Sequence, residues 1–152
     1  MMTLKIDLSG VKSLKRKVEA MRKTSVEVGF FPEDVYGPEN DNLPVAAVAQ
    51  MQQLGAGNYP SRPFFRNTLA DPSVISTLVK SIAFAAKNML CNNGDIRVQL
   101  TNVGNYLKYE VEQSIDNYPG NNSKWWADFK GKDDPLRYTD KMLNSVKVKI
   151  KK

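Results

Sequence analysis

Residues that could carry catalysis are few in this chain, and most lie in loops. The 152 residues include no histidine and a single cysteine, Cys91, which excludes imidazole catalysis, the catalytic triads that use histidine, and His-ligated metal sites. We expect Cys91, at a turn between two helices, to be a small buried residue rather than a nucleophile. The adjacent carboxylates at 33–34 and 133–134 leave a metal-dependent nuclease as an alternative. We predict no enzyme, with no catalytic residues, no metal and no cofactor.

Arg62 is better suited to recognition than to catalysis. Pro60 and Pro63 restrict the backbone on both sides of it, so its guanidinium is presented at little entropic cost for a bidentate contact with a carboxylate or with carbonyls. Phe64 and Phe65 follow as apolar anchors, and we expect one of them to enter the domain's own core. The group Arg62, Pro63, Phe64 and Phe65 is therefore a candidate subunit or partner interface. The alternative is that Arg62 ties its loop to its own domain.

A second candidate for recognition is the pair Trp125 and Trp126, which has Lys124, Lys130 and Lys132 close by in the sequence. Aromatic and basic side chains together can form a stacking surface for nucleic-acid bases. Tryptophans that pin a polar loop to its own domain are the other interpretation. We include Trp125 and Trp126 among the candidate interface residues.

Positive charge is the third feature, because 22 basic and 16 acidic residues give a formal net charge of +6. Near the C-terminus Val146, Val148 and Ile150 alternate with lysines, the pattern of a half-buried strand. Its other face carries a possible polyanion contact formed by Lys147, Lys149 and Lys151. Lysines on an edge strand also prevent unwanted strand pairing, so this face has a purely structural interpretation as well. The basic residues between 12 and 23 indicate either a solvated helix face or contact with an acidic partner.

The elements that position these residues follow from hydrophobic periodicity and from turn residues. We predict strands at 3–8, 25–31 and 146–150, and helices at 10–23, from 44 to about 54, 71–90, 96–116 and 141–144. The two long helices, joined by an Asn-Gly turn, should pack as an antiparallel pair. In that pair Val74, Leu78, Ile82 and Met89 should face Leu100, Val103, Leu107 and Val111. Residues 32–43 and 118–134 are predicted long loops or arms that order against a partner. The length fits a single domain spanning 1–152, and no apolar run suggests a membrane span.

Three stretches in this order resemble one known family. The first is Val45-Ala46-Ala47-Val48-Ala49 leading to Leu54-Gly55, and the second is the Pro-Ser-Arg-Pro-Phe-Phe segment within 59–69. The third is Pro135-Leu136-Arg137-Tyr138-Thr139-Asp140-Lys141-Met142-Leu143, which continues to Val146. They resemble the neck and tail-completion proteins of tailed bacteriophages, also called virion morphogenesis or minor tail proteins. The chain departs from the family pattern at Gln53 and Leu54, usually acidic and aromatic, at Asp140, usually glycine, and at Trp125 and Trp126, where a Ser/Thr-rich segment is usual.

The resemblance implies an α+β fold in which a small antiparallel sheet packs against two long antiparallel helices, with extended loops. It implies a structural virion protein of the head–tail connector, located in the neck or tail region of the virion and assembled in the host cytoplasm. The expected assembly is a homo-oligomeric ring, a hexamer or alternatively a dodecamer, between portal or adaptor proteins and the tail. DNA would pass through its channel without specific recognition, and no membrane is involved. A basic nucleic-acid-binding module is the alternative function.

Overall fold

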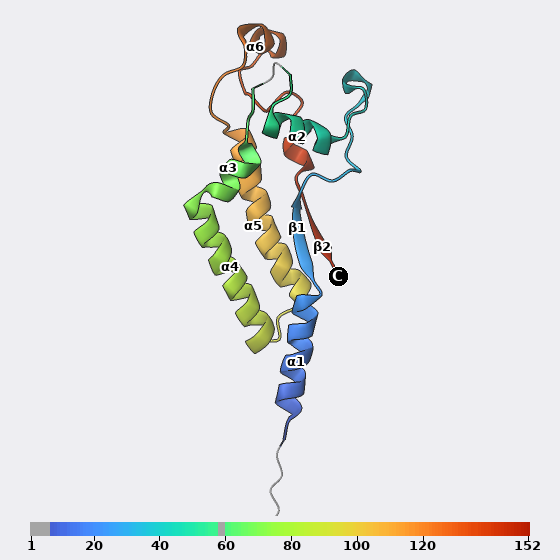
Figure 1. Cartoon of the computed structure of the whole chain (residues 1–152), viewed down its shortest axis with the longest axis vertical. Coiled ribbons are helices and arrows are strands. Elements are labelled where there is room, and N and C mark those ends of the chain that lie inside the picture. Colours follow the sequence, from blue (N-terminus) through green and yellow to red (C-terminus); the bar gives the residue numbers. More distant parts are fainter. Residues whose placement is uncertain (1–6, 58–59) are drawn as a thin grey trace, which may run out of the picture.

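The computed structural model describes residues 7–57 and 60–152, and its elements follow one another along an elongated molecule (Figure 1). The helices are α1 Ser9–Arg22, α2 Val45–Leu54, α3 Phe64–Ala70, α4 Pro72–Cys91, α5 Ile96–Asp116 and α6 Lys124–Lys130. Two 3-10 helices, η1 Pro38–Asn40 and η2 Leu143–Ser145, and two strands, β1 Ser25–Gly29 and β2 Lys147–Lys151, complete this part of the chain. The fold is α+β, as expected.

The two long helices α4 and α5 start and stop where the capping residues predict. The Oδ1 atom of Asp71 accepts a hydrogen bond from the Ser73 backbone nitrogen at 2.8 Å, and Pro72 occupies the first helical position, where its missing N–H costs nothing. Asp95 caps α5 in the same way through the nitrogens of Arg97 and Val98. The turn between the helices is short, so α4 and α5 lie side by side as an antiparallel pair (Figure 1).

The sheet consists of β1 and β2, which pair antiparallel with Ser25 opposite Lys151 and Gly29 opposite Lys147. It lies against α5 rather than against both long helices, so α5 is sandwiched between the sheet and α4. This close approach depends on Gly104 in α5. A Cβ atom added there would lie 2.5 Å from Cγ1 of Val148 and 2.7 Å from Cγ2 of Val26.

Two groups of buried apolar residues replace the single helix-pair core that the sequence suggested. The larger, which we call the main core, joins the C-terminal half of α5 to α2, α3 and the segment before β2; its buried members are Val45, Ala49, Phe64, Val111, Ile115, Leu136, Met142 and Val146. The smaller contains Ala85, Met89 and Val103 between α4 and α5, with Met21 of α1 packed against it. Val111 and Leu107 therefore belong to the main core, and Ile82 is half exposed. Of the predicted pairing, Leu78, Met89 and Val103 do pack together between α4 and α5, whereas the places predicted for Ile82, Leu107 and Val111 are wrong.

Several predictions for the connecting segments also need correction. The region 118–134 is not all loop, because it contains α6, whose N-cap residue Ser123 accepts from the Trp126 nitrogen. The region 32–43 remains a loop but already has partners in its own chain, since Tyr36 packs on the main core and the Val45 nitrogen donates to the Asp34 carbonyl at 2.8 Å. Cys91 is exposed rather than buried. Most of the strand predicted at 3–8 lies outside the described residues.

Candidate assembly site

Arg62 connects three separate segments at one end of the molecule. Its Nη1 atom donates to the carbonyl oxygen of Pro135 at 2.9 Å and to Oε1 of Gln52 at 3.2 Å. Its Nη2 atom donates to Oδ1 of Asn122 at 3.3 Å. The partly buried guanidinium has a lowered pKa because burial disfavours its charged form. Within the single chain, Arg62 thus ties its loop to its own domain, which was the alternative interpretation of this residue.

The C-terminal end of α2 holds the same loop through further hydrogen bonds. The backbone nitrogen of Arg62 donates to the Gln52 carbonyl at 2.7 Å, and the hydroxyl of Ser61 donates to the Gln53 carbonyl at 2.9 Å. Oε1 of Gln53 accepts from the Phe65 nitrogen at 3.0 Å and so satisfies a free N–H in the first turn of α3. A carboxylate could accept the same bond. The three stretches that carry the family resemblance therefore meet at this point.

The two phenylalanines after Pro63 play different parts. Phe64 is 1% exposed and belongs to the main core, so it is the anchor that enters its own domain and offers no surface to a partner. Phe65 is half-buried and meets the Phe64 ring edge-on, with centroids 6.4 Å apart. Of the two rings, only that of Phe65 has exposed surface left for an intermolecular contact.

Helix α6 carries an aromatic cluster at the same end of the molecule (Figure 1). The rings of Trp125, Trp126 and Phe129 stack on one another with centroid separations of 5.2–5.9 Å, and Tyr138 closes the group at 5.7 Å from Trp126. Trp125 is 71% exposed. Trp126 is half-buried and lies beneath the ammonium group of Lys130, at 6.0 Å. The helical spacing of α6 places Phe129 beside the two tryptophans, and the return of the chain adds Tyr138, which the sequence did not indicate.

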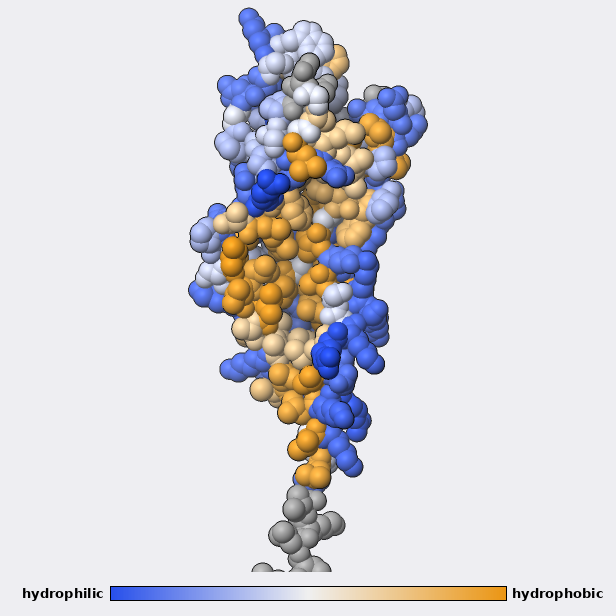
Figure 2. Space-filling view, viewed as in Figure 1, coloured by the Kyte–Doolittle hydropathy of each residue, from blue (hydrophilic) through white to orange (hydrophobic). Residues whose placement is uncertain are grey.

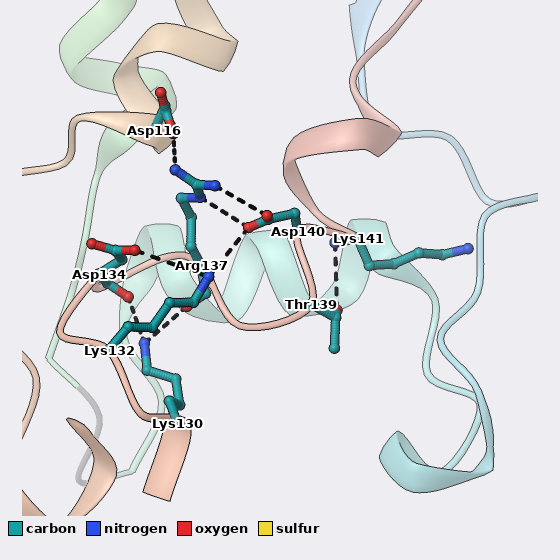
Figure 3. A network of polar contacts seen from close by, with 8 residues as sticks. All are labelled: Asp116, Lys130, Lys132, Asp134, Arg137, Thr139, Asp140 and Lys141. Atoms are coloured by element: carbon teal, nitrogen blue, oxygen red, sulfur yellow. Dashed lines mark hydrogen bonds and ion pairs between the residues drawn. The ribbon is translucent and has the colours of Figure 1, made fainter. Parts of the chain in front are cut away.

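A polar network centred on Arg137 supports this end of the molecule (Figure 3). Its guanidinium binds both oxygens of Asp140, at 2.9 and 3.0 Å, and also contacts Asp116 at the end of α5. The hydrogen bond from Arg137 lowers the pKa of Asp140. Lys132 lies 3.7 Å from the same carboxylate. The backbone of Asp140 has a φ of +55°, a conformation that glycine adopts most easily and that aspartate tolerates.

The lysine face of β2 differs from the free ammonium row that the sequence suggested. Lys147 pairs with Asp34 at 2.6 Å, Lys149 with Glu33, and Lys151 with Glu27 at 2.7 Å. Lys149 also lies 4.0 Å from the centre of the Phe31 ring. The row is neutralised by its own chain, so a polyanion would have to displace three carboxylates to bind here.

The carboxylate pairs considered for a nuclease site are separated and engaged elsewhere. Glu33 and Asp34 hold the β2 lysines, while Oδ1 of Asp133 accepts from the Asn122 nitrogen at 2.6 Å and Asp134 lies 3.9 Å from Lys132. Within residues 7–57 and 60–152 no group of three or more His, Cys, Asp or Glu side chains is placed to hold a metal ion.

A large apolar surface runs along α4 in the middle of the molecule and continues along α1 toward the end opposite α6 (Figures 1 and 2). On α1 it consists of Val11, Leu14 and Val18, and on α4 of Ile75, Val79 and Ile82; these six side chains are 40–64% exposed. None of the residues of α1 is buried. By length and composition alone, α4 is apolar enough to cross a membrane. Only 17% of its most apolar 18-residue stretch is buried inside the protein. A helix so apolar in water needs a cover that this single chain does not supply.

Comparisons with known proteins identified no similar protein. No protein-family model, no curated protein and no solved structure matches this chain.

Proposed function

We propose that this protein is a structural component of the head–tail connector of a tailed-bacteriophage virion. It assembles as a ring, a hexamer or alternatively a dodecamer, between the portal or adaptor complex and the tail, and DNA passes through the channel. It would be assembled in the host cytoplasm and retained in the neck or tail region of the virion. The observation that carries the proposal is the uncovered apolar surface of α1 and α4, because a chain that folds with so much exposed apolar area requires assembly partners.

The choice of a connector among assembly proteins rests on the resemblance of the three stretches. Their contacts support it, since the end of α2 and the Arg62 segment are joined by hydrogen bonds to each other and to Pro135, which lies 73 residues after Arg62. The φ of +55° at Asp140 supports it too, because glycine is usual at this position in the family. Both observations explain why these short stretches recur together: they build one structural unit.

The proposal is tested by the native mass of the purified chain, followed by imaging of negatively stained particles. We expect a closed ring with a central opening. A chain that stays monomeric at all concentrations would contradict a connector.

A basic nucleic-acid-binding module is the second candidate, supported by the exposed Trp125 ring and by the lysines of α6 and α1. Binding to phosphates by the monomer would weaken steeply with salt. Tight, salt-sensitive binding of DNA by a monomer that forms no ring would favour this candidate over the connector.

A further inference from the structure

We infer that the apolar side chains of α1 pack, in antiparallel orientation, against those of α4 in a second copy of this chain. We define the α1 stripe as Val11, Leu14 and Val18, and the α4 stripe as Ile75, Val79 and Ile82. The inference rests on the proposed assembly function and names the surfaces that would carry it.

The two stripes have the same length and complementary spacing. Each spans eight residues, and its two ends lie seven residues apart, or about 10 Å along the helix. The α1 stripe has steps of three and then four residues, and the α4 stripe has steps of four and then three. Laid antiparallel, Val11 therefore meets Ile82, Leu14 meets Val79 and Val18 meets Ile75. Such rows of side chains are those that interlock when helices pack.

The two stripes cannot meet within one chain. Helix α1 contacts the C-terminal end of its own α4, where the Nζ atom of Lys17 donates to the Leu90 carbonyl at 2.8 Å and Met21 packs beside Met89. Ile82 lies about 12 Å further along α4 from Leu90, since each residue adds about 1.5 Å. The N-terminal part of α1 extends beyond the end of the α4–α5 pair (Figure 1). The apolar stripe of α1 thus extends past the contact with its own α4 and stays exposed. Helix α4 of a second copy would cover it.

Charge selects the antiparallel orientation. One turn beyond Val18 stands Arg22, whose side chain is 75% exposed and whose contact with Glu19 is long, at 3.8 Å. In the antiparallel register Arg22 faces Asp71, one turn before Ile75, so opposite charges meet. At the other end Asp7 falls opposite Ala86, so no like charge opposes it there. A parallel register would instead bring Asp7 to Asp71, which places like charges together.

The other charged residues permit this packing. At about 100° per residue, Lys80 and Lys87 project well to one side of the α4 stripe. Lys15 flanks the α1 stripe and has a long aliphatic stem, so it can lie along apolar surface while its ammonium group stays in water. The contact therefore buries the two stripes without burying an unpaired charge.

Self-association of the full-length chain tests the inference, with native mass measured over a concentration series. Leu14→Asp and Ile82→Asp should each raise the concentration needed for assembly by roughly a hundredfold or more, because each would bury an unpaired carboxylate. Ser13→Asp and Thr77→Asp are the matched controls, since they add the same charge to other faces of the same helices. Circular dichroism should show all four variants folded, because all four positions are exposed.

The register has its own test. Arg22→Glu should weaken assembly because the new carboxylate would face Asp71, and adding Asp71→Asn, which keeps a side chain able to cap α4, should restore part of it. In a Cys91→Ser background, the combination Leu14→Cys with Val79→Cys should form intermolecular disulfides on mild oxidation, whereas Ser13→Cys with Val79→Cys should not.

Each result has one meaning. A wild-type ring that Leu14→Asp and Ile82→Asp leave intact overturns this interface but keeps the connector proposal. A wild-type twofold dimer that both variants disrupt supports the interface and overturns the ring. A wild-type monomer at all concentrations overturns both proposals, and if that monomer sediments with phosphatidylcholine vesicles, the cover of α4 is lipid.

Discussion

The Arg62 end of this elongated molecule and the surface along α1 and α4 are built in opposite ways. Around Arg62 the chain directs donors and acceptors from three segments toward one another, and Phe64 is buried beneath them. Along α1 and α4, six aliphatic side chains of the two stripes are exposed to solvent. The conspicuous Pro-Ser-Arg-Pro-Phe-Phe stretch thus stabilises the chain's own fold. The surface of α1 and α4, which needs a partner, shows only an ordinary amphipathic pattern. A substitution at the Arg62 end should therefore damage folding, and one at the α1 end should damage assembly.

Phe64→Ala should give the largest loss of stability, about 3–5 kcal/mol, because it removes a fully buried ring from the main core. Chemical denaturation of the variant under monomeric conditions measures it. An unchanged midpoint would show that the main core does not depend on α3.

Arg62→Ala comes next. It should lower the free energy of unfolding by about 2–3 kcal/mol, since three acceptors lose a charged donor in a partly buried site. Arg62→Lys should recover only part of this loss, because one ammonium group cannot reproduce the fork of the guanidinium. If Arg62→Ala folds with wild-type stability and yet fails to assemble, Arg62 is an interface residue after all.

Gly104→Ala should cost about 1–2 kcal/mol. The new methyl group overlaps Val148 and Val26, whose branched side chains have little freedom to move. Helix propensity favours alanine by about 1 kcal/mol and offsets part of that overlap. Adding Val148→Ala should relieve the overlap, so the two changes together should cost less than their sum. Strict additivity would mean that α5 and the sheet do not touch at this glycine.

The pH dependence at Asp140 should be smaller. Its pKa is lowered by Arg137 from 3.8, so its contribution to stability is present above pH 3.8 and is lost as the pH falls through the lowered value. Asp140→Asn keeps a residue that tolerates the positive φ but removes the charge. The stability difference between the wild type and this variant should therefore shrink in acid. A constant difference down to pH 2 would mean that the ion pair does not contribute.

Val11→Ala should have the smallest effect on the monomer, within about 0.5 kcal/mol, because the side chain is 64% exposed. The same change should weaken self-association measurably. A large loss of monomer stability would show that α1 is already covered within the chain.

Much of the fold was predictable because its signals are local. The apolar periodicity, the Asn-Gly turn and the alternation before Lys152 place α4, α5 and β2 within a few residues of their observed bounds. Helix α6 was missed because it has only seven residues and lies in a polar segment with two glycines and a proline, a composition typical of a loop. The resemblance suggested the sheet on two helices, but packing on α5 alone depends on Gly104, and nothing local distinguishes that glycine from any other.

The candidate site was less predictable, because its partners are distant in the sequence. Arg62 was conspicuous between its prolines, but its acceptors at Gln52, Asn122 and Pro135 follow from the tertiary fold alone. The lysines of β2 were visible as a row, while the carboxylates that neutralise them lie more than a hundred residues earlier. The periodicity of α1 and α4 was visible too, but periodicity does not reveal which apolar face stays uncovered.

The pairing of β1 with β2 joins residues 25–29 to residues 147–151, and this has a consequence for the order of folding. Closing so long a loop has a high entropic cost, and contacts this distant in sequence form late and slow the folding of a domain. During synthesis α4 and α5 emerge and pair while Val26 and Gly104 still lack the strand that covers them. The sheet is completed only when Val148 has left the ribosome. A shortened chain that lacks 147–151 would expose the sheet face of α5 and the free edge of β1, which makes it a target for proteolysis before it could enter an assembly.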